Sequence, residues 1–455
     1  MHPLPLLLDV PPAFAPKARY ALEELLRPLG LASVEQEEGA ALYYGPHPER
    51  SGARLALRCA DDTPGLFDAP RPLAPEAAGW MGWDGERWPV PVRSGDPRQF
   101  DGADVVASAF WWLSGWQEAA TRQRDVHGRF PYAASWQAAL GTAHLPAVDA
   151  YRCALAEALE AVGVPLRREP WGRGGERWAV LLSHDVDRVR RRRLGTLVRG
   201  VLQGDPVKAV RRALALGNAD LHGLDALLVE AERRGGRATL FAKAGRTGRL
   251  DAPYRLSREV RSAFRDAAER GHEIALHPST FAMRHPDHLA SERDRLARAV
   301  GALAPIVRAH YLRVDPALSP AELEAAGFRA DASLGFSAAV GYRRGTGRPF
   351  RLWDLQRGRP SMLWEVPLVV MDTTLLQHLG MDAQGAAEET ARVLDGARRT
   401  GGCASILWHN RPLDEPVGRE ALATYRTVLD AAQAHGAALL PIGAALGGTG
   451  GSGRH

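Results

Sequence analysis

From residue 178 onward, short apolar runs alternate with longer segments whose apolar residues recur at helical spacing. Runs of this length are typical of buried strands, whereas Leu224, Leu227 and Leu228 fall on one face of a helix. Strands are predicted at 178–183, 238–242, 273–276, 306–311, 328–331, 363–367, 403–408 and 437–442, and helices at 224–233, 289–303 and 386–399. Strands that alternate with helices indicate a parallel sheet, and about eight of them favour a closed (β/α) barrel over an open sheet.

The part of the chain before this pattern predicts a smaller α/β domain of residues 1–165. Short strands are expected at 42–44 and 54–57 and a helix at 150–162. Residues 166–176, which contain Pro170 and several glycines, are interpreted as a linker. The barrel domain then covers 177–446, and the Gly-rich tail 447–455 is expected to be disordered. A chain of 455 residues is long enough for two such domains.

Seven of the 12 Trp residues lie between Trp80 and Trp136, which makes this segment unusually aromatic. Within it, residues 104–113 are apolar and are predicted to form a helix. Stacking on sugars and packing in the core are both roles for such side chains. Packing is favoured, because Trp is mostly a core and interface residue.

Composition narrows the class of partner. The net charge of +5 does not require a nucleic acid, and the one basic run, 188–193, belongs to no recognised nucleic-acid module. Apolar residues at helical spacing over 194–202 follow this run, so the segment either lies on an anionic membrane or packs on the barrel, and packing is favoured.

The first residues of the chain and its cysteines indicate in which cellular compartment the protein is expected. The first 15 residues lack the pattern of a secretory signal, and no apolar segment approaches the length of about 20 residues that spans a bilayer. Cys59, Cys153 and Cys403 are sparse, which argues against a disulfide framework or a Cys-based zinc site. A cytoplasmic protein is therefore expected.

Strongly polar residues collect where the predicted strands end. They are Asp185, Asp187, His277, Arg308, His310, Arg313, Asp331 and His409. In a (β/α) barrel, this rim holds the active site. Two carboxylates as close as Asp185 and Asp187 repel each other, and a bound cation is the usual remedy.

Asp and His together select a divalent metal such as Zn, Mn, Co or Fe(II). An open position on such a metal activates water, a second acid takes the proton, and a separate His protonates the leaving group. The constellation therefore predicts the hydrolysis of an amide or an ester.

These motifs resemble those of the polysaccharide deacetylases of the NodB-homology superfamily, carbohydrate esterase family 4. Residues 183–187 (SHDVD) are similar to the first motif of the family, 277–279 (HPS) to half of the second, 308–311 (RAHY) to the third, and 407–409 (LWH) to the fifth. The resemblance implies a distorted (β/α) barrel and one divalent ion, with zinc preferred over Co, Mn or Fe. It also implies roles for individual residues: Asp185 as base, Asp187 and His277 as metal ligands, His409 as general acid, and Arg308 as the cation that keeps Asp185 ionised.

Two departures from the family pattern leave the third ligand open. Phe281 stands where the second motif has its second His, and the third motif lacks its Pro. His310 is the favoured replacement, with His285 and His288 as alternatives. A bacterial subgroup with an N-terminal extension and an H-D-V-D motif, often linked to surface-polysaccharide synthesis, also resembles this chain at 125–130, 308–313 and 341–346.

The predicted function is a metal-dependent hydrolase that removes an N-acetyl or O-acetyl group from a sugar or glycan. Arg343 and Arg344, on a loop flanked by glycines, are expected to hold an anionic group of the substrate, together with Arg313 and Asp331. One alternative is a non-catalytic glycan-binding or scaffold protein on a decayed barrel. Another is a hydrolase of a different C–N bond, such as that of a cyclic amide.

Overall fold

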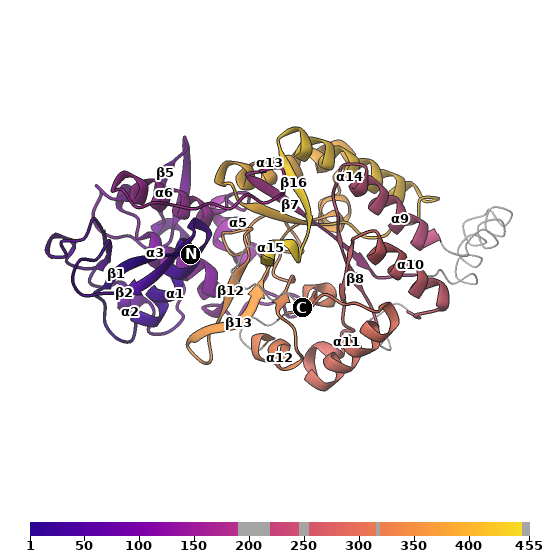
Figure 1. Cartoon of the computed structure of the whole chain (residues 1–455), viewed down its shortest axis with the longest axis horizontal. Coiled ribbons are helices and arrows are strands. Elements are labelled where there is room, and N and C mark those ends of the chain that lie inside the picture. Colours follow the sequence, from indigo (N-terminus) through magenta and orange to yellow (C-terminus); the bar gives the residue numbers. More distant parts are fainter. Residues whose placement is uncertain (190–218, 245–253, 315–318, 448–455) are drawn as a thin grey trace.

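The computed structural model describes residues 1–189, 219–244, 254–314 and 319–447. Ten strands of the second part of the chain form one curled sheet (Figure 1). They are β7 (Trp178–Val186), β8 (Thr239–Ala242), β9 (Glu273–Leu276), β10 (Ile306–Val307), β11 (Ala330–Asp331), β12 (Phe350–Asp354), β13 (Arg359–Glu365), β14 (Leu368–Met371), β15 (Cys403–Leu407) and β16 (Ala437–Pro441). All described pairings in this sheet are parallel except that of β12 with β13.

The sheet is open rather than closed. Its strand order is β12-β13-β11-β10-β9-β8-β7-β15-β14, with β16 also paired to β7, and among the described residues no ladder joins β12 to β14. The expected closed barrel is therefore corrected to a curled sheet that covers only part of a barrel wall. Strand β7 is central, since it pairs with β8, β15 and β16 and is buried at every residue.

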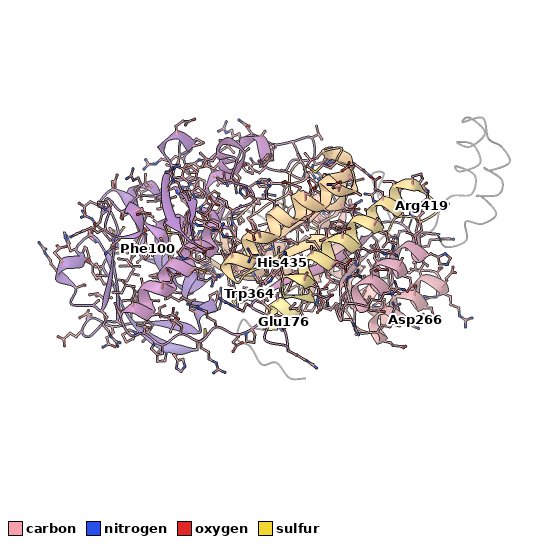
Figure 2. All side chains as sticks on the ribbon, turned by 90° about the horizontal axis from the view of Figure 1, so that it is seen from above. Phe100, Glu176, Asp266, Trp364, Arg419 and His435 are labelled. Atoms are coloured by element: carbon pink, nitrogen blue, oxygen red, sulfur yellow. The ribbon has the colours of Figure 1, made fainter. Side chains whose placement is uncertain are left out.

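Helices cover the outside of the curled sheet (Figure 1). They are α9 (Ala219–Glu232), α10 (Arg258–Glu269), α11 (Pro286–Val300), α12 (Ser319–Ala325), α13 (Ala383–Thr400) and α14 (Pro416–Ala434). The short helix α15 (Ala444–Gly447) lies on the inner side instead, where Ala445 belongs to the same buried cluster as Ala179 and Leu181 of β7. Asp382 caps the N-terminus of α13, because its side chain accepts the Gly385 N–H at 2.8 Å. Helices α13 and α14 pack side by side, and in Figure 2 Arg419 and His435 mark the two ends of α14.

The predicted strands and helices of this region largely correspond to elements of the structure, and the main differences among the strands concern β10, β12 and β14. The run predicted as 306–311 forms a strand only at Ile306–Val307, and residues 310–312 form a 3-10 turn in which Tyr311 and Leu312 have positive φ angles of 59° and 55°. Strand β12 was not predicted, and β14 was not separated from the apolar run that ends β13.

The first part of the chain has its own small sheet. Strands β1 (His2–Leu8), β2 (Leu31–Glu35), β3 (Leu42–Gly45) and β4 (Leu55–Arg58) are parallel in the order β2-β1-β3-β4, and β5 (Gly79–Trp83) and β6 (Glu86–Val90) form a hairpin. The helices are α1 (Ala15–Leu26), α2 (Thr63–Leu66), α3 (Val105–Ser114), α4 (Trp116–Ala119), α5 (Trp136–Leu140) and α6 (Ala147–Ala161). The predictions at 42–44, 54–57, 104–113 and 150–162 correspond to β3, β4, α3 and α6.

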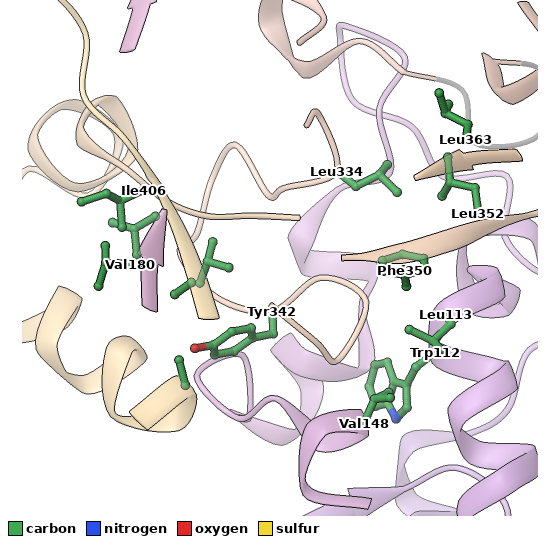
Figure 3. Close-up of a cluster of buried hydrophobic side chains, with 14 of the residues drawn as sticks. Trp112, Leu113, Val148, Val180, Leu334, Tyr342, Phe350, Leu352, Leu363 and Ile406 are labelled. Carbon is green, nitrogen blue, oxygen red and sulfur yellow. The ribbon is translucent and has the colours of Figure 1, made fainter. Parts of the chain in front are cut away.

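One continuous core joins the two parts (Figure 3). Trp112, Leu113 and Val148 from the first 165 residues belong to the same buried cluster as Tyr342 and Phe350. Tyr342 donates its N–H to the carbonyl of Ala143 at 2.8 Å. The Trp-rich segment is likewise core, because its Trp residues 88, 111, 112, 116 and 136 are buried. The first part of the chain therefore packs directly against the second part, and the linker is not their sole connection.

Arg343 and Arg344 lie in this shared core, which corrects the expectation that they hold substrate. Both side chains are buried and pair with Glu118, at 2.6 Å from Arg343 Nη2 and 3.1 Å from Arg344 Nε. Burial opposes ionisation of Glu118, but the two guanidinium groups hold its pKa below the usual range. Gly115 is required beside them, because it has a φ of 73° and a Cβ there would overlap the Arg344 guanidinium.

Buried Asp104 gives a prediction about stability and pH. Its side chain caps α3 by accepting the Ala107 N–H at 2.9 Å and also accepts the Tyr44 hydroxyl, and burial raises the pKa of Asp104 to about 7. Because the folded state binds this proton more tightly, the contribution to stability is present below about pH 4 and is lost as the pH rises through 7.

The Asp104→Asn variant keeps a cap acceptor but does not titrate. In denaturant titrations from pH 4.5 to 8, we expect wild type to lose stability relative to this variant, with a limiting slope of about 1.4 kcal/mol per pH unit. Parallel stability curves for the two proteins would contradict the raised pKa.

Two of the expectations from sequence fall outside the described residues. These are the basic amphipathic segment, from residue 190 onward, and the tail from residue 448. Among the helices of the described ranges, none has both the length and the apolar character that a membrane span needs.

Candidate metal centre

Strand β7 positions the carboxylates of Asp185 and Asp187. Side chains alternate between the two faces of a strand, so Ser183 and Asp185 share one face and His184 lies on the other. His184 Nδ1 lies 2.9 Å from the Trp408 carbonyl, and burial lowers the pKa of His184 to about 4, which keeps this ring neutral and structural. Asp187 follows the last residue of the strand, where the chain reaches the rim of the sheet.

The carboxyl ends of β7, β8, β9 and β15 surround a cavity of about 750 Å³. The structure brings five predicted site residues together in its lining, namely Asp185, Asp187, His277, His310 and His409. The lining also contains Lys243, Thr373, Asn410 and Arg411 and, from the first part of the chain, His127 and Arg129.

Asp187, His277 and His310 have the spacing of metal ligands. Asp187 Oδ1 lies 3.3 Å from His277 Nε2 and 3.4 Å from His310 Nε2. Ligand atoms about 2.0–2.2 Å from a tetrahedral zinc ion are roughly 3.3–3.6 Å from one another. The observed distances match this geometry.

The hydrogen bonds around His277 show why a cation fits here. His277 Nδ1 lies 2.7 Å from the Arg308 carbonyl, which can only accept, so Nδ1 carries a proton and Nε2 is the nitrogen left to coordinate a metal ion. Nε2 faces Asp187 Oδ1, a buried carboxylate oxygen that also lies 3.3 Å from the Lys243 ammonium. In the neutral form of His277 both atoms are acceptors, and a cation between them would satisfy both.

The charge state of Asp187 agrees with a ligand role. Burial alone opposes its ionisation, but His277, Lys243 and His409 hold the pKa of Asp187 well below its usual range. The carboxylate is therefore available to a metal ion at neutral pH.

Of the three candidates for the third ligand, the structure places only His310 beside Asp187 and His277. His285 and His288 instead pack around exposed Phe281, with ring centroids 4.4 and 4.9 Å from it. Phe281 therefore belongs to an aromatic cluster separate from Asp187, His277 and His310.

Asp185 is held by a buried guanidinium. Arg308 Nη1 donates to Asp185 Oδ1 at 3.1 Å and to Ser183 Oγ at 2.8 Å, and Arg308 Nε donates to the Ala332 carbonyl at 2.8 Å. Arg308 is fully buried, and its guanidinium lies 4.2 Å from the centre of the Phe241 ring. These contacts fix the Asp185 carboxylate with its charge balanced, next to the candidate metal ligands.

His409, which follows β15, is held as an imidazolium. Its Nδ1 lies 2.6 Å from Asp372 Oδ1, and Arg411 Nε donates to Asp372 Oδ2 at 2.9 Å. Burial alone would lower the pKa of His409, but Asp372 and the two pocket aspartates raise it to about 9. Since His409 Nε2 lies 3.8 Å from Asp187 Oδ2, a protonated ring faces the candidate ligands.

Asp331 and Arg313 do not line the cavity, which corrects their expected roles in binding substrate. Asp331 is fully buried and accepts a hydrogen bond from Ser333, and burial raises the pKa of Asp331 to about 6. Arg313 donates through Nε to the carbonyl of His127 at 3.0 Å.

Lys243 is a pocket residue that the sequence interpretation missed. It follows β8 directly, and its ammonium lies 3.3 Å from both Asp187 Oδ1 and His310 Nε2 in a nearly solvent-free position. The signal was present in the sequence, because Lys243 ends a predicted strand just as the other pocket residues do.

Replacement of this ammonium is expected to strengthen metal binding. Even at the dielectric constant of water, a unit charge about 4 Å from a divalent ion contributes about 2 kcal/mol of repulsion. We expect Lys243→Met to bind Zn²⁺ at least about tenfold more tightly than wild type in isothermal titration calorimetry. Lys243→Arg, which keeps the charge, is the control and should gain nothing, and equal affinities for all three proteins would contradict the prediction.

Comparisons with known proteins add distant similarities. Residues 33–163 match a family described as a family of unknown function (DUF7033), and no curated protein matches the chain. A structure from Mycobacterium smegmatis, provisionally described as a polysaccharide deacetylase, is 18% identical at a TM-score of 0.41 and covers 60% of this chain and 90% of its own. The peptidoglycan deacetylase PdaC from Bacillus subtilis is 11% identical at a TM-score of 0.32, covering 60% and 91%. The Bc1960 peptidoglycan N-acetylglucosamine deacetylase is 13% identical at 0.32, covering 58% and 86%.

Proposed function

We propose that this protein is a metal-dependent hydrolase that removes an acetyl group from a sugar or glycan. The observation that carries the proposal is the grouping of Asp187 Oδ1 with His277 Nε2 and His310 Nε2, at 3.3 and 3.4 Å, which is the spacing of metal ligands. His310 completes the ligand set, and zinc is the preferred ion because two His and one carboxylate form a common catalytic zinc site.

The chain supplies an acid and a base beside that site. A bound divalent ion would polarise the acetyl carbonyl and activate water. Asp185, held by Arg308, accepts the proton of the attacking water. His409, kept protonated by Asp372, donates a proton to the departing nitrogen or oxygen. Water and the acetylated sugar thereby yield acetate and the free amine or alcohol.

The assignment of a glycan substrate rests on the likeness of the motifs to polysaccharide deacetylases. The arrangement of base, ligand set and proton donor is compatible with an amide or an ester. A protein that only binds glycans needs neither a base such as Asp185 nor a proton donor such as His409, which favours the hydrolase over a non-catalytic glycan-binding protein.

Acetate release tests the proposal directly. The metal-free protein and the protein loaded with Zn²⁺ or Co²⁺ are incubated with N-acetylated and O-acetylated amino sugars and with their oligomers. We expect acetate to appear only with metal, in equal amount to the amine or alcohol that is freed. A loaded protein that releases no acetate from any of these compounds, but opens a cyclic amide, would replace this proposal with a hydrolase of another C–N bond.

A further inference from the structure

A turn from the first part of the chain forms part of the pocket wall, although it lies far from the other pocket residues in the sequence. In this turn, residues 125–129, Asp125 Oδ1 accepts the N–H groups of His127 and Arg129, each at 2.9 Å. Asp125 Oδ2 pairs with the Arg129 guanidinium at 2.7 Å. The turn is therefore a defined unit that presents His127 and Arg129 to the cavity.

Two hydrogen bonds connect this turn to the segment that carries His310. Arg129 Nη1 donates to the carbonyl of Tyr311 at 2.7 Å, and Arg313 Nε donates to the carbonyl of His127 at 3.0 Å. Each segment thus donates a guanidinium hydrogen bond to the main chain of the other.

The aromatic rings between the two segments form a stack of three. The His127 ring lies on the Tyr311 ring with centroids 5.2 Å apart and planes at 5°, and the Tyr311 ring lies on the His310 ring at 4.0 Å and 23°. The outer ring of this stack comes from the first part of the chain, and the inner ring is the candidate metal ligand.

The main chain beside His310 depends on outside support. Tyr311 and Leu312 both have left-handed φ angles, 59° and 55°, which residues with large side chains adopt only where surrounding contacts fix them. The bond from Arg129 to the Tyr311 carbonyl and the ring of His127 are contacts of that kind.

We propose that the 125–129 turn is a positioning element of the candidate metal centre. It holds Tyr311, and through Tyr311 it holds the His310 ring in the orientation that a ligand needs. The first part of the chain is then a component of the site, which gives that part a role in the reaction. This inference rests on the metal site of the proposed function.

Variants of His127 in the full-length protein test the proposal. Groups that orient a metal ligand typically contribute a factor of 10–100 to affinity. We expect His127→Ala to weaken Zn²⁺ binding by about tenfold or more in a chelator competition and to change the visible spectrum of the Co²⁺ form. His127→Phe, which restores a flat ring, should recover both readouts.

Val126→Ala is the matched control, because Val126 lies at the tip of the same turn and is 96% exposed. It should behave as wild type, and unfolding curves should show that every variant is folded. Unchanged affinity and spectrum in His127→Ala, or no recovery in His127→Phe, would overturn the positioning role while leaving the metal site intact. A wild type that binds neither Zn²⁺ nor Co²⁺ would overturn the proposed function itself.

Discussion

Asp187→Ala and His277→Ala are each expected to lose the divalent ion that wild type binds at about one per chain. Asp187 Oδ1 is the atom that both imidazoles face, at 3.3 and 3.4 Å, and His277 is held in the tautomer that leaves Nε2 free to coordinate. The loss of a ligand should lower affinity by more than about a hundredfold, which is the upper range for residues that only orient a ligand. Elemental analysis after incubation with Zn²⁺ and buffer exchange measures this.

The histidines offer a matched comparison for the third ligand. His310→Ala should lose metal as His277→Ala does, because only His310 of the three candidates lies within the ligand group. His285→Ala and His288→Ala remove exposed rings that pack on Phe281, and both should retain the ion. If His285→Ala lost the metal and His310→Ala kept it, the ligand set would be wrong.

The sequence was sufficient to group four residues of the candidate site because of a property of parallel sheets. Apolar runs predicted the central strands, and the carboxyl ends of parallel strands meet at one edge, so residues far apart in sequence converge there. Asp185, Asp187, His277 and His409 were located in this way and lie together. His310 reaches the same edge although the observed strand before it, Ile306–Val307, is shorter than the predicted 306–311, and His310 begins the turn that contains the left-handed residues.

Contacts between the two parts of the chain were not predictable, since periodicity reports burial but not partners. Arg343 and Arg344 lie between glycines, which suggested a flexible loop. In the structure the loop is buried because both guanidinium groups meet Glu118, a residue more than 200 positions earlier. His127 was missed as a neighbour of Tyr311 for the same reason.

Asp185→Asn is expected to abolish most turnover and yet retain the metal. The amide keeps the shape of the carboxylate and an oxygen to accept from Arg308 Nη1, but it cannot take a proton from water. General-base catalysis typically contributes a factor of about 10²–10⁴, so kcat for acetate release should decrease by a factor in that range.

Arg308→Lys should also lower kcat, because an ammonium cannot donate at once to Asp185, Ser183 and Ala332 as the guanidinium does.

Asp187→Asn is the matched variant, since the same change is made two residues away. Asp187 is the carboxylate that the imidazoles of His277 and His310 face, so this variant should lose both metal and turnover. Asp185 lies farther from the ligand set, with Oδ2 3.9 Å from His277 Nε2, so its variant should lose turnover alone. Metal content and kcat measured on the same preparations separate the two roles. Turnover of Asp185→Asn within about threefold of wild type would remove Asp185 as the base, because general-base catalysis contributes far more than this.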